Sequence, residues 1–129
     1  ITIDTSALLA VLLNEPSKAQ LIALTRNHLL VAPSSLDWEV GNALSALFKR
    51  QRISLDQALE AWTIFERIPI RREPVDMALS LQLAYERQAY AYDMYMLSCS
   101  LRFRTPLLSL DNRLNQIAHA LGIPILWNA

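Results

Sequence analysis

Short apolar runs alternate along the chain with longer stretches whose hydrophobic residues recur at helical spacing, a pattern typical of strands alternating with helices. The apolar runs predict five strands, at Ile1–Thr5, Leu29–Ala32, Ile68–Arg71, Thr105–Leu110 and Ile123–Trp127. The helical stretches begin with the run SALLAVLL and continue over 17–27, 34–51, 54–67, 74–88, 92–103 and 112–121. Strands alternating with helices favour a parallel sheet with right-handed crossovers.

Three helix starts carry their own signals. Ser34 with Asp37, and Ser54 with Gln57, have the spacing of a capping box, in which each residue bonds the backbone of the other. Pro74 stands where the first turn of a helix tolerates proline, because no hydrogen-bond donor is needed there. These signals predict where three of the helices begin.

The composition indicates a single layered domain. Hydrophobic residues make up 53% of the 129 residues, which is above the usual share for globular proteins. The runs PLLSL and IPILW are nearly continuous in apolar residues, as in strands buried on both faces. We therefore expect one α/β domain over residues 1–129, with helices covering both faces of the sheet.

Scarce residue types exclude several kinds of site. Two glycines cannot build a glycine-rich phosphate loop, and a lone cysteine, Cys99, cannot form an internal disulfide or a cysteine-rich zinc site. Cys99 lies in an apolar helical stretch, so we expect it in the core. No apolar run approaches the roughly 18 residues that span a bilayer, and no signal-peptide pattern is present. We therefore expect a cytoplasmic protein without a membrane partner.

The formal net charge of zero argues against a broad basic face for nucleic acid. Ten of the twelve basic residues are arginine, however, and arginine suits two-pronged contacts with phosphate or carboxylate. A local basic rim therefore remains compatible with the composition.

Four acidic residues stand apart from the others, which fit helix caps or solvated helix faces. Asp4 ends the first predicted strand and Asp111 ends the fourth, while Asp93 opens the helix that feeds the fourth strand. Glu39 lies early in the long helix after the second strand. In an open α/β sheet, ligands bind at the carboxyl ends of strands where the strand order reverses. If the first and fourth strands are neighbours, these four carboxylates meet at that edge.

Four converging carboxylates repel one another unless a hard divalent cation neutralises them. Carboxylate oxygens without nearby histidine or cysteine favour Mg²⁺ or Mn²⁺ over zinc. The alternative is that Asp4, Asp93 and Asp111 each simply cap the helix that follows. Their common placement at strand ends favours the metal site.

The same acids lie in four short motifs: IDTSALLAVLLNEP with Asp4, WEVGNALSAL with Glu39, YDMYMLSCSL with Asp93 and LLSLDNRL with Asp111. In this order and spacing, the chain resembles the PIN domain family, and within it the VapC-type toxins of bacterial and archaeal toxin–antitoxin pairs. Each motif is short, so the ordered set over the whole chain carries the resemblance.

The resemblance implies a PIN-like three-layer α/β/α fold, with a parallel sheet of about five strands in the order 3-2-1-4-5. It also implies an Mg²⁺- or Mn²⁺-dependent endoribonuclease whose catalytic and metal-binding residues are Asp4, Glu39, Asp93 and Asp111. Ser6 matches a small hydroxyl residue of the family that can bond a carboxylate or a water on the metal. An ordinary serine at a helix start is the alternative for Ser6. Ser109 stands where the family commonly has threonine, and it keeps the hydroxyl.

The partners that the resemblance implies are an RNA substrate, with tRNA and rRNA as candidates, and a cognate antitoxin. By analogy with the family we also expect a homodimer, with the apolar helices 17–27 and 34–51 supplying the interface. The antitoxin would lay an amphipathic segment into an apolar groove of the early helices, and would reach the carboxylates with a basic residue.

The chemistry we expect is metal-assisted phosphodiester hydrolysis, in which no side chain is a covalent nucleophile. His28 and His119 lie outside the four motifs, so we assign them no role. Tyr90, Tyr92 and Tyr95 could stack on bases, but core packing together with Met94 and Met96 is the expectation. The alternatives are a non-toxin PIN nuclease of RNA processing, a non-catalytic module that binds RNA or protein, and an enzyme acting on DNA or a small phosphoester.

Overall fold

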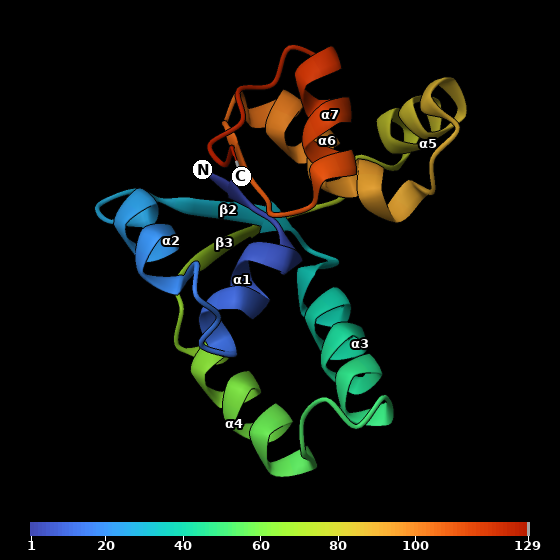
Figure 1. The fold of residues 1–129 in the computed structure, drawn as a ribbon. Helices are drawn as coiled ribbons and strands as arrows, with labels where there is room; N and C mark the ends of the chain where they lie inside the picture. The colour runs from blue at the N-terminus through green and yellow to red at the C-terminus, as the bar shows by residue number, and fades with distance from the viewer. Residues whose placement is uncertain (129) are drawn as a thin grey trace.

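The computed structural model describes residues 1–128, and four parallel strands form its sheet (Figure 1). The strands are β1 (Thr2–Ile3), β2 (Leu30–Pro33), β3 (Ile70–Glu73) and β4 (Leu107–Leu108). Their order is β3-β2-β1-β4, with Thr2 paired to Val31 on one side and to Leu107 on the other. This order agrees with the first four places of the expected arrangement and makes β1 and β4 neighbours.

The fifth strand expected at 123–127 is not formed. Within the described residues this segment makes a single isolated parallel bridge, between Ile125 and Leu107, along the outer side of β4. Leu107 N donates to Pro124 O at 2.8 Å, and Leu126 N donates to Leu107 O at 3.0 Å. Pro124 itself has no backbone N–H, which limits the ladder that this segment can build.

Helices cover both faces of the sheet and give three layers (Figure 1). In Figure 1, the four N-terminal helices lie below the sheet and the three C-terminal helices lie above it. The helices are α1 (Thr5–Leu12), α2 (Lys18–Thr25), α3 (Leu36–Lys49), α4 (Leu55–Glu66), α5 (Met77–Arg87), α6 (Ala91–Phe103) and α7 (Asn112–Ala120).

Two apolar clusters correspond to these two helical layers. Leu8, Val40 and Phe65 belong to the cluster that α1 to α4 form against one face of the sheet. Met96 and Ala118 belong to the cluster on the other face. The two residues of β4 divide between them, Leu108 in the first cluster and Leu107 in the second. This division follows from the alternation of side chains along a strand.

Some predicted helix starts are confirmed and others are wrong. The capping box of Ser54 and Gln57 is present, with both reciprocal bonds formed. The capping box expected for Ser34 and Asp37 is wrong. The cap residue of α3 is Ser35, whose side chain makes no cap hydrogen bond. Helix α5 starts at Met77 rather than in the turn of Pro74, because the side chain of Asp76 caps it by accepting from Leu79 N at 3.1 Å.

Cys99 is buried, in agreement with its expected place in the core. Its apolar surroundings raise the pKa of the thiol to about 11. In the described part of the chain we find no helix with the length and apolar character needed to cross a membrane.

Candidate active site

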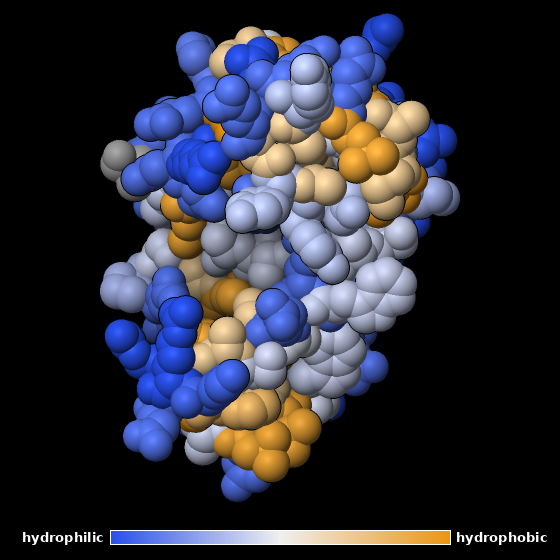
Figure 2. Space-filling model, turned by 90° about the vertical axis from the view of Figure 1, so that its right-hand side faces the viewer, coloured by the Kyte–Doolittle hydropathy of each residue, from blue (hydrophilic) through white to orange (hydrophobic). Residues whose placement is uncertain are grey.

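The four acids singled out by the sequence line one pocket of about 550 Å³ at the carboxyl edge of the sheet. Figure 2 looks onto the right-hand side of Figure 1 and shows the surface hollowed between the upper and lower helices. The residues that line the pocket are Asp4, Thr5, Ser6, Leu9, Trp38, Glu39, Asn42, Ala43, Tyr92, Asp93 and Asp111. Four separate segments of the chain therefore contribute to one site.

Asp4 directly follows β1, and its side chain is held by one hydroxyl group from the first turn of α1 and one from the residue after β4. Its Oδ2 accepts from Ser6 Oγ at 2.6 Å and from Ser109 Oγ at 2.7 Å. The same hydroxyl oxygens accept from the backbone N–H groups of Leu110 (2.9 Å) and Asp111 (3.0 Å). Within residues 1–128 each hydrogen bond to the Asp4 side chain reaches Oδ2, which leaves Oδ1 available to a ligand.

The capping alternative describes two of the three aspartates. Asp4 caps α1 by accepting from Ser6 N at 3.4 Å, and Asp111 caps α7 by accepting from Arg113 N at 2.9 Å. Asp93 does not cap α6, because the cap residue of that helix is Tyr90. The caps use one oxygen of each carboxylate. Capping and ligand binding are therefore compatible at both positions.

Glu39 and Asp93 carry the electrostatic signature of crowded acids. Burial raises the pKa of Glu39 to about 7, the Ser35 hydroxyl opposes this by donating a hydrogen bond of 2.8 Å, and Asp4 and Asp93 add to the rise. The pKa of Asp93 is raised first by burial and then by the charges of Asp111 and Asp4, while Arg113 opposes the rise. The mutual repulsion shows that the four carboxylates share one electrostatic environment.

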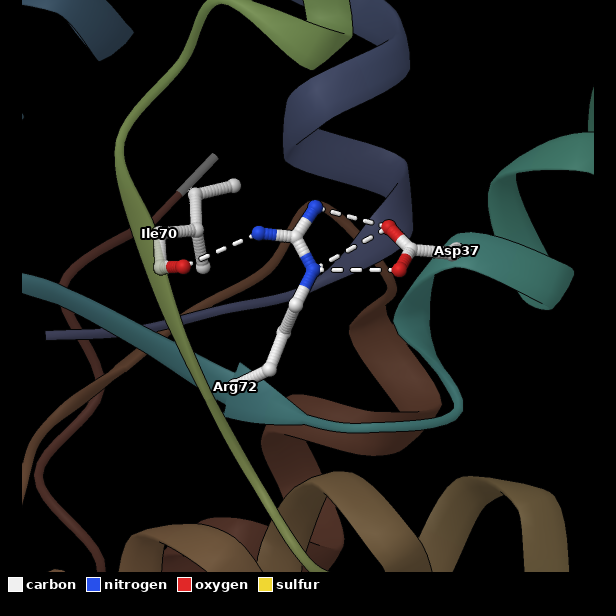
Figure 3. A network of polar contacts seen from close by, with 3 residues as sticks. All are labelled: Asp37, Ile70 and Arg72. Atoms are coloured by element: carbon white, nitrogen blue, oxygen red, sulfur yellow. Dashed lines mark hydrogen bonds and ion pairs between the residues drawn. The ribbon is translucent and has the colours of Figure 1, made fainter.

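A salt bridge fixes the first turn of α3, which carries Glu39 (Figure 3). Arg72 on β3 donates from Nη2 to Asp37 Oδ1 at 2.7 Å and from Nε to both carboxylate oxygens at 3.1 Å. Its Nη1 donates to Ile70 O at 2.9 Å, and its guanidinium lies 5.4 Å from the centre of the Phe65 ring. Asp37, which the sequence analysis assigned to a capping box, thus ties α3 to the sheet.

The donor chemistry of the pocket fits a hard divalent cation. Carboxylate and hydroxyl oxygens line it, with neither histidine nor cysteine among the lining residues. Over residues 1–128, however, no three or more His, Cys, Asp or Glu side chains are grouped closely enough to hold a metal ion as they stand. The spacing has two causes. Carboxylates without a cation between them repel one another, and Glu39 and Asp111 accept hydrogen bonds from Ser35 and Arg113 instead.

Two exposed aromatic side chains lie at the pocket: Trp38, to which the sequence gave no site role, and Tyr92, for which base stacking was the alternative to core packing. Trp38 is 74% exposed and Tyr92 is 61% exposed. The core packing expected for Tyr90 and Tyr92 is wrong, because both side chains are exposed, Tyr90 by 83%. The core packing expected for Met94 is confirmed, because this residue is fully buried. A signal was present in the sequence: Trp38 and Tyr92 each directly precede an acid of the site in a helical first turn.

A second pocket, of about 570 Å³, lies at the opposite edge of the sheet, where Leu30 and Ile70 begin their strands. Its lining is mainly apolar, and Arg71 supplies the charged side chain. His28 and His119 are exposed and line neither pocket. The acids gather in the first pocket, which makes it the candidate for chemistry.

Comparison with known proteins places this arrangement in a family. The model of the PIN domain family matches residues 1–120. Ribonuclease VapC9 of Mycobacterium tuberculosis and VapC ribonuclease Mb0985 of Mycobacterium bovis are each 29% identical over 120 residues, covering 93% of this chain and 92% of the relative.

Two solved structures share the fold at low sequence identity. PAE2754 from Pyrobaculum aerophilum has a TM-score of 0.69 at 19% identity, over 90% of this chain and 77% of that one. VapC20 of Mycobacterium tuberculosis, a sarcin–ricin loop cleaving toxin, has a TM-score of 0.67 at 16% identity, over 98% of each chain. Both comparisons concern the arrangement of helices and strands.

Proposed function

The chain belongs to the PIN domain family, and on that premise we propose that it is a metal-dependent endoribonuclease, the toxin of a toxin–antitoxin pair, acting in the cytoplasm. Its relatives of comparable length are named as VapC ribonucleases. The observation that carries the proposal is the meeting of Asp4, Glu39, Asp93 and Asp111 around one pocket at the carboxyl edge of the sheet.

We assign Asp4, Asp93 and Asp111 as the residues that would hold Mg²⁺ or Mn²⁺, with Glu39 beside them. When bound, such an ion supplies positive charge for the phosphate and the means of activating water at neutral pH. Ser6 and Ser109 keep Asp4 in place through its Oδ2, so Oδ1 can face the ion.

The remaining residues would bind and orient the substrate. Arg113 lies near enough to Asp93 to oppose the rise in its pKa, and a guanidinium can donate two hydrogen bonds to one phosphate. The salt bridge of Asp37 with Arg72 holds the turn that carries Glu39. A chain of zero net charge would otherwise bind RNA weakly, so contacts at the pocket have to supply the affinity.

The proposed antitoxin has a groove that runs into the active site. A pocket of about 410 Å³ lies between α1 and α3 and shares Ser6, Leu9 and Ala43 with the acidic pocket. Its other apolar lining residues include Leu13 and Leu47. An amphipathic antitoxin segment in this groove could bring a basic residue to the carboxylates, where charge-assisted hydrogen bonds are strong.

For the homodimer we propose the exposed face of α5 in place of the helices 17–27 and 34–51 that the sequence suggested. The apolar residues Leu36, Val40 and Leu44 of α3 are buried within the subunit and are unavailable for an interface. Helix α5 instead exposes Met77 (46%), Leu81 (55%) and Tyr85 (87%), which are spaced four residues apart and so lie on one face. We propose that this face forms the two-fold contact.

A cleavage assay tests the enzymatic part of the proposal. Labelled RNA and DNA of matching sequence are incubated with the protein in Mg²⁺, in Mn²⁺ or in EDTA. We expect RNA to be cut with either metal, EDTA to abolish cutting and DNA to stay intact. Cutting of DNA alone would favour the alternative of a DNA nuclease, and binding without cutting would favour the non-catalytic module.

Growth measurements test the toxin part separately. Expression of the chain alone should arrest growth of the host, and co-expression of the protein encoded beside it should restore growth. A protein that cuts RNA in the assay but leaves growth unchanged at confirmed expression would be better described as an RNA-processing PIN nuclease.

A further inference from the structure

Aromatic side chains stand next to the acids on α3 and α6, two of the helices that line the pocket. Trp38 precedes Glu39 in the first turn of α3, and Tyr92 precedes Asp93 in the first turn of α6. Both aromatic residues line the acidic pocket together with the four carboxylates. The two rings therefore reach the same pocket from elements that lie far apart in the sequence.

Neither ring is explained by packing within the subunit. Trp38 is 74% exposed and belongs to neither apolar cluster, whereas Trp62 packs against the core. Tyr92 is 61% exposed, and its ring centre lies 5.3 Å from that of Tyr95 at an interplanar angle of 57°. This tilted contact braces the Tyr92 ring at the pocket without burying it.

The helix that carries Trp38 is itself held in place. Asp37, its neighbour in the chain, is bound by Arg72 through two guanidinium nitrogens. A stacking platform works best when it is already ordered, because less conformational freedom is then lost on binding. The first turn of α3 meets that condition.

Charge alone gives this protein a weak hold on a polyanion. The chain is neutral overall, and the pocket lining itself carries four carboxylates and no basic residue. An aromatic ring can bind RNA despite these negative charges, since its face stacks on an uncharged base and does not contact the phosphate. The pocket of about 550 Å³ is within the range of about 300 to 1,000 Å³ typical of small-ligand sites.

We propose that Trp38 and Tyr92 stack on the bases of the two nucleotides that flank the scissile phosphate and thereby position the RNA for cleavage. This inference rests on the proposed ribonuclease function and adds the residues that position its substrate. A base that is paired and stacked inside a duplex cannot offer its face to either ring. Asn42, one helical turn after Trp38 and also in the pocket lining, lies on the same face of α3 as Trp38.

The first test compares single-stranded oligoribonucleotides that either keep their bases or have base-free riboses on both sides of the cut. For the normal substrate, kcat/KM should fall about tenfold in Trp38→Ala and in Tyr92→Ala, which is a typical loss for one stacked base. For the base-free substrate both variants should match the wild type. Trp38→Phe and Tyr92→Phe should recover most of the loss, and Leu59→Ala, at an exposed leucine on α4, should have no effect.

The double comparison separates stacking from a merely structural role. If Trp38→Ala loses as much kcat/KM on the base-free substrate as on the normal one, the ring does not act through a base and the proposal fails. It fails equally if neither alanine variant changes kcat/KM. Melting temperatures within about 2 °C of the wild type, as surface substitutions allow, confirm that the variants are folded.

The second test does not need catalysis, so it stands even if the chain cuts no RNA. In EDTA, a single-stranded oligoribonucleotide should quench tryptophan fluorescence, and a base-free ribose phosphate of equal length should not. The quenching should be lost in Trp38→Phe, although Trp62 and Trp127 remain. Quenching that persists in this variant, or that the base-free polymer reproduces, would overturn the assignment of Trp38.

Discussion

Ser109 Oγ donates a hydrogen bond of 2.7 Å to Asp4 Oδ2, linking two residues 105 positions apart at the ends of neighbouring strands. Ser109 is fully buried, and its oxygen also accepts from Asp111 N at 3.0 Å. One hydroxyl therefore fixes the orientation of the first acid of the site and the backbone of the last. Because Ser6 bonds the same carboxylate oxygen, the position of Asp4 is determined twice over.

Ser109→Ala should destabilise the protein and slow cleavage together. Its loss removes the partner of the partly buried Asp111 N–H and one donor to Asp4, which should cost about 1–3 kcal/mol of unfolding free energy. Loss of a residue that orients a metal ligand typically lowers activity about 10- to 100-fold. Ser109→Thr keeps the hydroxyl and should remain near the wild type in both denaturant unfolding and cleavage. Equal damage in the two variants would mean that side-chain volume matters here, not the hydroxyl.

Replacing Glu39 should remove a pH-dependent destabilisation of the metal-free protein. The pKa of Glu39 is raised from 4.5 to about 7 on folding, so its destabilising effect is absent below 4.5, grows between these values and is complete above 7. In EDTA at pH 8, Glu39→Gln should unfold with about 1 kcal/mol more free energy than the wild type, a figure reduced for partial exposure. At pH 4.5 this advantage should vanish. An advantage of equal size at both pH values would contradict the electrostatic origin.

Arg72→Lys should loosen the first turn of α3 while keeping the charge. Lysine cannot reproduce the two-nitrogen contact with Asp37 or the stacking on Phe65. Since this salt bridge is partly exposed, we expect a loss of about 0.5–1 kcal/mol in unfolding free energy. We also expect a higher KM for RNA, because this turn carries Glu39 and Trp38. Arg87→Lys, on the exposed end of α5, serves as the control and should change neither quantity.

Leu81→Glu should convert a dimer into a monomer. A charge at the centre of the apolar stripe on α5 would have to be buried against its symmetry mate, where like charges repel. Light scattering at micromolar concentration should then report half the mass of the wild type. Leu59→Glu on α4, where the leucine is similarly exposed (56%), should leave the dimer intact. A wild-type protein that is already a monomer would remove the dimer proposal altogether.

Local signals predicted the parts of this fold that depend on neighbours in the chain. The capping box of Ser54 with Gln57 follows from the sequence, because residue spacing is a local feature, whereas the order β3-β2-β1-β4 is the one that the family resemblance implied. The strand expected at Thr105–Leu110 is shorter in the structure, where β4 covers only Leu107–Leu108, because the length of a strand depends on its pairing with neighbours. The fifth strand failed for the same reason, because Pro124 has no N–H to extend the ladder beyond the bridge of Ile125 with Leu107.

Parts of the candidate site depend on contacts that no local pattern encodes. Asp37 has the spacing of a capping residue, yet Arg72, which lies 35 positions further along, takes its carboxylate in the folded chain. The exposure of Tyr92 was misjudged because α6 buries Met94 and Met96 and leaves its first turn at the pocket. Only the packing of the helix decides which of these neighbouring side chains is covered.

The carboxylate substitutions Asp4→Asn and Asp93→Asn should separate catalysis from folding. Both variants should fold, and without metal they should be at least as stable as the wild type, since removing one of several repelling charges relieves the repulsion. Asp4→Asn has to be judged with the loss of its two serine hydrogen bonds in mind, so Asp93→Asn is the cleaner case. Glu60→Gln, on the exposed face of α4, is the matched control.

The most direct test of the proposed site is the RNA cleavage rate of Asp93→Asn in saturating Mn²⁺, measured beside the wild type and Glu60→Gln. If the four acids form the metal-dependent site, Asp93→Asn should lose cleavage by at least about a thousandfold, a scale typical of removing a central catalytic group. Its melting temperature in EDTA should be equal to or above that of the wild type. A folded Asp93→Asn protein that cuts RNA at the wild-type rate would contradict the account.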